Sequence, residues 1–279
     1  MTTEPVPSST PDTAPRNEAA RWREKIRRDE WTLPTPGLAE GHAQANLLVL
    51  PSLLADAFER FCRENPRPCP LLERLPTGSP HPRLMARDTD LRTDVPRYWV
   101  FENGEKVAEA GDVRRWWCED LTAFLLGCSF TFEWALQQAG LRLLHVEQNR
   151  NVAMYRTSLR LATVEPFGGT MVVSMRWFEP AQAAQAARIS ARFPRMHGAP
   201  VHIGDPAAIG IDDIGRPDFG DPVEAPPGFV PVFWPCGVTS QTAALTARPQ
   251  IAICHAPGHM LLLDRTHHEF EESTAISGV

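Results

Sequence analysis

Apolar residues in the first half of the chain recur mostly at helical spacing. This spacing predicts a charged helix over residues 16–31 and an amphipathic helix over Pro51–Glu64. Residues 97–101 and 106–109 flank an Asn-Gly pair and predict a β-hairpin with a tight turn. Residues 119–139 are apolar on nearly every side of a helical wheel and are followed by a glycine, so we expect a helix that is buried all round.

After residue 140 the pattern changes to short apolar runs separated by Gly, Pro and Asp, which is typical of buried strands. These runs are residues 141–146, 152–155, 171–175, 201–203, 232–234, 251–253 and 260–263. Helices predicted over Pro180–Arg192 and Thr239–Ala247 would complete two β-α-β units. Because right-handed crossovers join parallel strands, we expect an α/β protein with a mixed, largely parallel sheet flanked by helices.

The turn-rich stretch from Gly204 to Gly228 indicates a smaller inserted domain. We predict a main α/β domain from residues 21–158 and 230–279, an inserted α/β domain over 159–229, and a disordered tail over 1–20. A chain of 279 residues is long enough to bury one large core or two unequal ones.

Composition limits the classes of partner and the cellular compartment that we expect for this protein. The formal charge is −6 and the only cationic run is near the N-terminus, which disfavours a nucleic-acid partner. The longest apolar stretch, residues 121–130, is shorter than the ~20 residues of a membrane span, and the first residues do not resemble a signal peptide. The six cysteines include no Cys-x-x-Cys pair, which favours reduced thiols in a cytoplasmic protein. A homo-oligomer is a candidate assembly.

Two common kinds of cofactor lack support in the sequence. The only lysines, Lys25 and Lys106, lie in the charged helix and in the hairpin turn, so neither suits the buried Schiff base of pyridoxal phosphate. The chain also has no Gly-Lys-Ser/Thr and no Gly-x-Gly-x-x-Gly, so we expect no nucleotide cofactor.

Polar residues and turn residues follow several predicted strands. They are Arg176, Gly204, Asp205, Cys236, Gly237, Cys254, His255, Pro257, Gly258 and His259. In parallel sheets a ligand binds beyond the carboxyl ends of the strands, so these residues predict a small-molecule site. Ordinary turns are the alternative for each of them taken singly.

Glu133 stands among aromatic neighbours in the helix predicted over 119–139. Burial would raise its pKa, so that the carboxyl group could donate a proton near neutral pH. Ser129, one helical turn earlier, could bond it or the substrate. Tyr155, Arg156 and Arg176 lie at or beside strand ends, where either arginine could hold a substrate carboxylate or instead pair with a structural acid.

Cysteine and histidine residues allow two further kinds of chemistry. Cys128 and Cys236 could be nucleophiles, although buried cysteines are more often inert packing. His255 and His259 do not share a helical face, but they could bind manganese or zinc together with Cys254 or His202. A hydrogen-bonded loop histidine is the simpler alternative.

Taken together, ten motifs carry a resemblance to a known family. They are Gln44–Leu47, Cys69–Leu72, Thr93–Tyr98, Gly127–Glu133, Asn151–Thr157, Met171–Arg176, Arg192–Pro206, Pro217–Asp221, Phe233–Thr239 and His255–Met260. From about residue 22 to 264 the chain resembles the bacterial "putative hydro-lyase" family, whose animal relatives are D-glutamate cyclases. It departs from the usual pattern at Thr131, Ala153, Pro235 and Cys254. None of these four is a proposed catalytic group.

The resemblance implies a two-domain α/β enzyme of the carbon–oxygen lyase class. The most concrete activity in that family converts D-glutamate into 5-oxo-D-proline and water, so a small acidic metabolite such as D-glutamate is the expected partner. A hydro-lyase acting on another small amino or hydroxy acid is one alternative, and a non-catalytic binder of an acidic metabolite is another.

These candidates suggest a mechanism. Arg176 or Arg156 holds the α-carboxylate of the substrate, and Asp205 or His202 takes the proton of its ammonium group. Protonated Glu133 donates to the departing hydroxyl, while Ser129 and the backbone near Gly237 hold the oxyanion. A divalent metal on His255 and His259 is the alternative electrophile.

Overall fold

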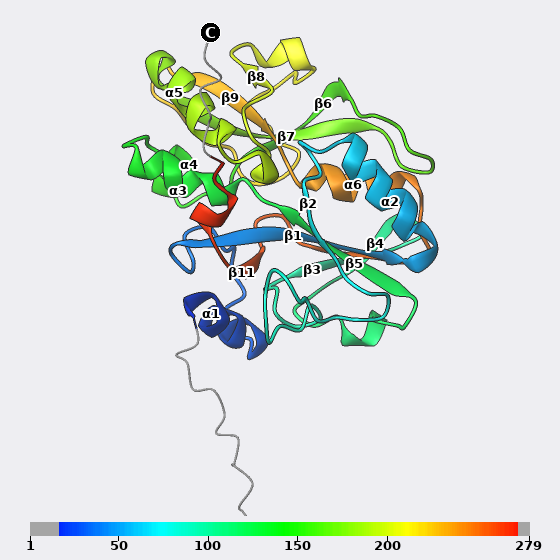
Figure 1. The fold of residues 1–279 in the computed structure, drawn as a ribbon. Coiled ribbons are helices and arrows are strands. Elements are labelled where there is room, and N and C mark those ends of the chain that lie inside the picture. Colours follow the sequence, from blue (N-terminus) through cyan, green and yellow to red (C-terminus); the bar gives the residue numbers. More distant parts are fainter. Residues whose placement is uncertain (1–16, 273–279) are drawn as a thin grey trace, which may run out of the picture.

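The computed structural model describes residues 17–272, and its strands form two antiparallel sheets (Figure 1). The helices are α1 (Glu18–Arg27), α2 (Ser52–Glu64), α3 (Phe130–Gln138), α4 (Leu144–Glu147), α5 (Pro180–Ala191) and α6 (Val238–Thr246). Short 3₁₀ turns span Arg114–Trp116, Pro194–Met196, Pro206–Ile209 and His267–Phe270. The strands are β1 (His42–Pro51), β2 (Leu71–Arg74), β3 (Tyr98–Glu102), β4 (Glu105–Ala110), β5 (Leu121–Gly127), β6 (Met154–Arg160), β7 (Thr170–Phe178), β8 (His202–Ile203), β9 (Val230–Pro235), β10 (Ala252–His255) and β11 (Leu261–Thr266).

The first sheet is built around β1. Its order is β2-β5-β1-β10-β3-β4, and β11 also pairs with β1. The register of β1 with β5 runs from Ala45 opposite Gly127 to Pro51 opposite Leu121. Both faces are covered, because Leu48 and Phe124 pack with α2 and α6 while alternate residues pack into the largest core cluster.

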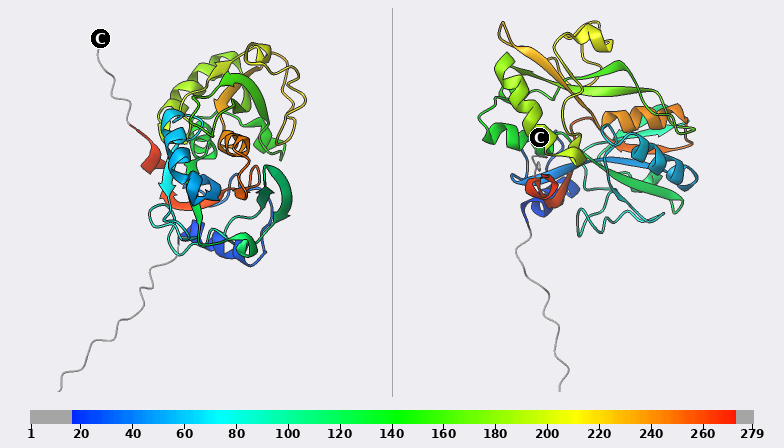
Figure 2. Two further views of the ribbon diagram at one scale, coloured as in Figure 1. Left: turned by 90° about the vertical axis from the view of Figure 1, so that its right-hand side faces the viewer. Right: turned by 45° about the horizontal axis from the view of Figure 1, so that its top comes forward.

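The second sheet has the order β6-β7-β9-β8. Along β7, Val173 and Met175 pack against the apolar residues of the 201–223 segment. The alternate residues Val172, Ser174 and Arg176 face the rest of the molecule. Helix α6 lies between the two sheets, since it contacts β7 of one and β1 and β10 of the other (Figure 2).

The α/β class is confirmed, but the prediction of a largely parallel sheet is wrong, because the strand pairs in both sheets are antiparallel. The right-handed crossover rule applies to two strands that neighbour each other in one sheet. Here β9 lies between β7 and β8, and α6 connects β9 of the second sheet with β10 of the first. The two helix crossovers were predicted; the pairing of their strands was not.

The long helix predicted over 119–139 is also wrong in its first half, which forms strand β5. Every residue of β5 is buried, so the run carries no polar alternation that would mark it as a strand. Helix α3 begins only at Phe130. The strand predicted at 141–146 is wrong as well, because Leu144–Glu147 forms the short helix α4. Strands β1 and β2 were not predicted.

The remaining elements agree with prediction to within a few residues. These are α1, α2, α5 and α6, the β3–β4 hairpin, and the later strands. Residues 1–16 of the predicted tail lie outside the described residues, and Glu18–Ala20 belong to α1. The division into a main and an inserted domain stays a prediction. Between residues 17 and 272, no helix is both long and apolar enough to cross a membrane.

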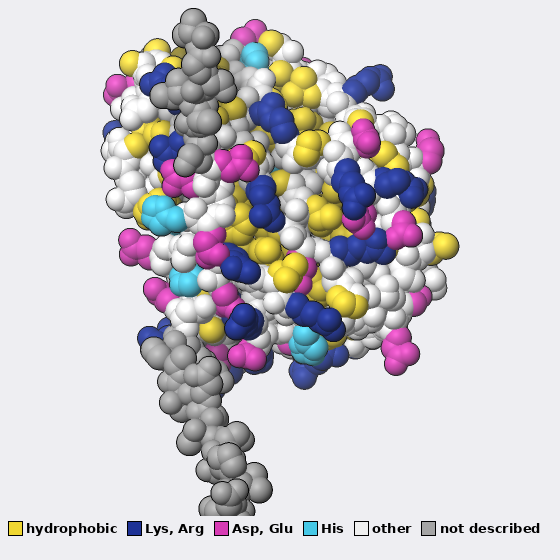
Figure 3. All heavy atoms as spheres, in the orientation of Figure 1, with side chains coloured by type: hydrophobic (Ala, Val, Ile, Leu, Met, Phe, Trp, Pro, Cys, Tyr) yellow, Lys and Arg dark blue, Asp and Glu magenta, His cyan; other side chains and the backbone are white. Residues whose placement is uncertain are grey.

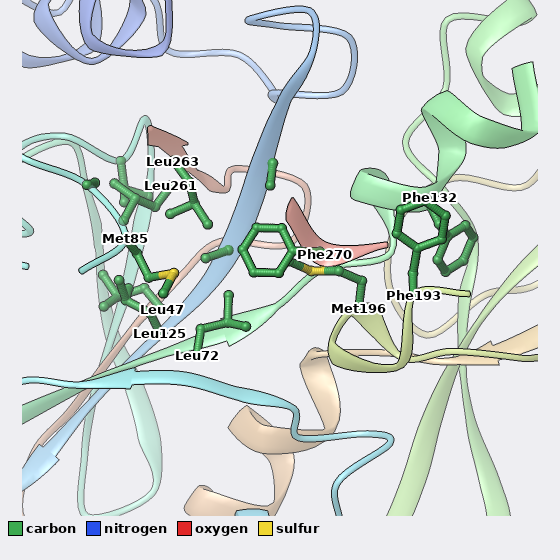
Figure 4. Close-up of a cluster of buried hydrophobic side chains, with 14 of the residues drawn as sticks. Leu47, Leu72, Met85, Leu125, Phe132, Phe193, Met196, Leu261, Leu263 and Phe270 are labelled. Atoms are coloured by element: carbon green, nitrogen blue, oxygen red, sulfur yellow. The ribbon is translucent and has the colours of Figure 1, made fainter. Parts of the chain in front are cut away.

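The largest hydrophobic cluster joins the two halves of the molecule. Figure 4 shows Leu47, Leu125 and Leu261 of the first sheet at one end of this cluster and Phe132 and Phe193 at the other. On the face drawn in Figure 3, basic side chains are interspersed with acidic and uncharged ones. The shared core holds α3 and the β9–α6 junction close to the first sheet, and this arrangement positions the site.

Candidate active site

A small buried cavity of about 20 Å³ lies where β1, the β5–α3 junction and the β9–α6 junction meet. Such a volume holds about one water molecule. Its walls are Asn46, Cys128, Ser129, Phe130, Val152, Met154, His197, Cys236, Gly237, Val238, His255, Gly258 and Met260. The cavity therefore collects residues that are distant in the sequence.

Two helices begin at this cavity with nearly the same backbone geometry. Ser129 precedes α3 with φ −61° and ψ −21°, and Gly237 precedes α6 with φ −61° and ψ −19°. A cysteine comes directly before each of them. Helix N-termini carry partial positive charge, so both ends favour a negatively charged ligand or oxyanion in the cavity.

Close packing explains why a glycine starts α6. A Cβ atom at Gly237 would overlap the side chain of Asn46. Asn46 itself donates from Nδ2 to the carbonyl oxygen of Gly127 at 2.5 Å. The side chain of Asn46 thus occupies the space between the two junctions.

His197, a wall residue of this cavity, has an unpaired ring nitrogen. Its side chain is 1% exposed and lines the cavity, and Nε2 has no hydrogen-bond partner among the described residues. Nδ1 lies 2.7 Å from the carbonyl oxygen of Arg67. A carbonyl only accepts, so Nδ1 carries the hydrogen and Nε2 carries a lone pair. Burial lowers the pKa of His197 to about 4, so the ring is neutral at pH 7.

His255 lies on another wall and is largely satisfied. Its Nδ1 lies 3.1 Å from the amide nitrogen and 3.2 Å from the carbonyl oxygen of Leu47. Gln241 Nε2 lies 3.2 Å from Nδ1 and 3.3 Å from Nε2. Burial lowers the pKa of His255 to about 4. This histidine ties β10 to β1 and α6 while one edge faces the cavity.

A buried ion pair between Arg176 and Glu133 contacts Ser129. Arg176 donates from Nε to Glu133 Oε1 at 2.8 Å, from Nη1 to Ser174 Oγ at 2.7 Å, and from Nη2 to Ser129 Oγ at 2.9 Å. His145 Nε2 lies 3.2 Å from the same Glu133 oxygen. The guanidinium of Arg176 is thereby engaged within the protein and fixes the orientation of Ser129.

The predicted protonation of Glu133 is wrong. Burial alone would raise the pKa of Glu133, but the charges and hydrogen bonds of Arg176 and His145 lower it to about 2. Glu133 is therefore a carboxylate at neutral pH and has no proton to donate. The residue is 5% exposed, so the predicted burial of its side chain is confirmed.

Both cavity cysteines are neutral thiols. Burial raises the pKa of Cys128, and it raises the pKa of Cys236 to about 11. The amide groups of Phe130 and Val238 donate to these sulfurs and oppose that effect only in part. At pH 7 the thiols therefore offer polar, uncharged walls.

The other predicted site residues lie outside the cavity. Tyr155 packs on the opposite face of the second sheet, where its hydroxyl donates to Ile214. Arg156 is exposed, 3.7 Å from Asp218. His202 and Asp205 are partly or fully exposed near β8, where His202 Nε2 donates to the Asp205 carbonyl at 2.7 Å. The structure does not bring these four residues together with Glu133.

The two histidines proposed as metal ligands do not form a cluster with other ligands. His259 Nδ1 lies 3.1 Å from the carbonyl oxygen of Pro257, and burial lowers its pKa. From residue 17 to 272, no group of three or more His, Cys, Asp or Glu side chains could hold a metal ion. These residues do not fit a typical metal site, so no step below is routed through a metal.

Comparison with known proteins decides the family. A family model described as D-glutamate cyclase matches residues 122–264. The chain belongs to the D-glutamate cyclase family. This confirms the resemblance seen in the sequence. Every wall residue of the cavity lies in a motif that carried it, namely Gln44–Leu47, Gly127–Glu133, Asn151–Thr157, Arg192–Pro206, Phe233–Thr239 or His255–Met260.

Similar proteins carry the name "putative hydro-lyase". One from Rubrobacter xylanophilus is 58% identical and covers 91% of this chain and 98% of the relative. One from Streptomyces avermitilis is 52% identical over 92% and 91%, and one from Bordetella pertussis is 53% identical over 84% of both chains. The family and these names support the predicted enzyme class, a lyase.

A solved structure of a nitrogen repressor-like protein from Methanococcus jannaschii covers 90% of this chain and 98% of its own, at 9% identity and a TM-score of 0.37. A TM-score this low does not establish a shared fold.

Sequence reasoning missed several residues of the cavity. Asn46, Met154, His197 and Met260 were quoted within motifs but were not singled out. His197 adopts φ +80°, a conformation that non-glycine residues rarely take and that often marks a functional site. The neighbouring glycine, Gly198, was a local signal for an unusual backbone at this position.

Proposed function

We propose that this chain is a hydro-lyase that cyclises D-glutamate to 5-oxo-D-proline and releases water. Its family membership supports the substrate. The observation that most directly supports this site is the buried, unpaired Nε2 of His197. His197 lines the cavity at which α3 and α6 begin. A neutral imidazole with a lone pair is a proton acceptor, and helix N-termini stabilise negative charge.

The cyclisation moves two protons from nitrogen to oxygen. The ammonium nitrogen of glutamate has three hydrogens and the lactam nitrogen has one, while the released water carries the other two. His197 Nε2 takes the first proton from the ammonium group. The freed amine then attacks the γ-carboxyl carbon and forms a C–N bond.

The collapse of the tetrahedral intermediate uses the same histidine. The imidazolium of His197 returns its proton to the departing oxygen, the C–O bond breaks, and the nitrogen loses its second proton to complete the water. The partial positive charge at the starts of α3 and α6 is suited to stabilise the oxyanion. One histidine therefore replaces the acid and base pair of Glu133 and His202 or Asp205 inferred from sequence.

Substrate binding requires the cavity to widen. D-Glutamate is larger than the present volume of about 20 Å³. Met154 and Met260 line the cavity, and methionine side chains change rotamer easily. We infer that these two side chains move when the substrate enters.

The test is a product assay with D-glutamate and L-glutamate, followed by chiral chromatography. Wild-type protein should form 5-oxo-D-proline. His197→Asn should lower kcat by about a hundredfold or more, since a general base contributes roughly 10²–10⁴. Asparagine tolerates the positive φ of this position. The matched variant His202→Asn should stay within about twofold of wild type because that ring lies outside the cavity.

Full activity of the His197 variant, or its loss in the His202 variant, would contradict the assignment. Absence of product from both enantiomers would contradict the substrate and favour another hydro-lyase reaction or a binding protein.

A further inference from the structure

A second cavity lies beside α3. Its volume is about 350 Å³, within the range of roughly 300–1,000 Å³ that is usual for small-molecule sites. The segment 37–44 and residues of α3 form most of its walls, and Val146 and His267 complete it. Phe130 lines both cavities, so the two are neighbours.

Two residues that line this cavity each have a side-chain atom without a hydrogen-bond partner among the described residues. The side chain of His267 is 7% exposed, and its Nδ1 makes no hydrogen bond with the described residues. A neutral imidazole has a tautomer with its lone pair on Nδ1, so this atom can accept a hydrogen bond. Glu133 contacts Arg176 and His145 through Oε1 only, which leaves Oε2 free at a residue that lines the cavity.

The charge and shape of the walls indicate what these acceptors bind. Glu40 and Glu133 are the acidic wall residues, and none of the wall residues is lysine or arginine. Burial lowers the pKa of His267 to about 4, so its ring is neutral at pH 7. Phe130 and Trp134 add aromatic surface, which attracts cations as well as apolar groups.

We propose that this second cavity is a binding site for a small organic ammonium ion whose N–H groups bond to Glu133 Oε2 and His267 Nδ1. An anion would meet no positive partner there, and an apolar molecule would leave both buried acceptors unsatisfied. The proposal does not depend on the proposed cyclase activity.

The same ion pair connects the second cavity with the first. Arg176 bonds Glu133 on one side and Ser129, a wall of the first cavity, on the other. A cation at Glu133 Oε2 competes with Arg176 for the carboxylate. Occupation of the second cavity therefore changes the surroundings of Ser129.

The test uses benzylammonium chloride as the probe, with benzyl alcohol and benzoate as uncharged and anionic counterparts of similar shape. Isothermal titration of the full-length protein at pH 7 should show benzylammonium binding at least tenfold more tightly than either counterpart. In amide NMR spectra, benzylammonium should shift the Ser129 resonance.

Matched variants locate the site. Val146 is 43% exposed and lines the cavity, so Val146→Trp should fill it and weaken benzylammonium binding at least tenfold. Val107, 50% exposed on β4, lies outside the cavity, and Val107→Trp should leave binding unchanged. Equal affinity for benzyl alcohol or benzoate, no effect of Val146→Trp, or an unmoved Ser129 resonance would overturn the proposal.

Discussion

The two strand-to-helix junctions at the first cavity share a backbone and differ in what holds them. At the β5–α3 junction, Ser129 is fixed by the buried charges of Arg176 and Glu133. At the β9–α6 junction, Gly237 is held by its close approach to the uncharged side chain of Asn46. The same backbone geometry is thus held by charged side chains at the β5–α3 junction and by close packing at the β9–α6 junction. The first junction should respond to charge and pH, and the second to side-chain volume.

The largest expected effect is at the α3 junction. Arg176→Met leaves Glu133 as a buried carboxylate without its main partner and should lower the free energy of unfolding by ~3–5 kcal/mol. Urea unfolding measures this change. Arg156→Met removes an exposed arginine and should cost less than ~1 kcal/mol. Equal effects of the two variants would mean that charge does not hold this junction.

Acid should weaken the same junction. The pKa of Glu133 is depressed from 4.5 to about 2 in the folded state, so the stability it contributes is present above about pH 4.5 and is lost as pH falls toward 2. The gap in unfolding free energy between wild type and Glu133→Gln should therefore shrink by ~3 kcal/mol over that window. A gap that does not change with pH would refute the depressed pKa.

The β9–α6 junction should lose stability when side-chain volume is added at Gly237. Gly237→Ala forces a Cβ atom into the Asn46 side chain and should cost ~1–3 kcal/mol together with most of the turnover. Asn46→Ala removes the obstacle, so adding Gly237→Ala to that variant should cost little further stability. If the Gly237→Ala protein is as stable as wild type, close packing does not hold this junction.

Removing the Ser129 hydroxyl should have the smallest effect on stability. Ser129→Ala deletes one of the bonds to Arg176 and leaves the others in place, so it should cost about 1 kcal/mol. Ser158→Ala, at an exposed position of β6, is the control and should be neutral. A loss as large as that of Arg176→Met would show that Ser129, rather than the ion pair, holds the start of α3.

The fold was predictable where local pattern and tertiary position agree. Helix α2 has one apolar face and the β3–β4 hairpin has an Asn-Gly turn, so both could be read from the sequence. Strand β5 could not, because burial on both faces removes the alternation that distinguishes a strand from a buried helix. Pairing direction was missed because α6 connects strands of different sheets.

The chemistry of the site was only partly predictable. The aromatic surroundings of Glu133 indicated burial correctly, yet the sign of its pKa shift depends on Arg176, which a different strand supplies. His197 and His202 stand in the same motif, and only the fold shows that the first lines the cavity. The motifs located the site, and the roles of single residues required the structure.

The most direct test of the central claim is a crystal structure of the protein with 5-oxo-D-proline bound. We predict electron density for the lactam in the first cavity, between the starts of α3 and α6, with a ring atom within hydrogen-bond distance of His197 Nε2. Density beside Arg156 and His202, or in the second cavity alone, would contradict the account.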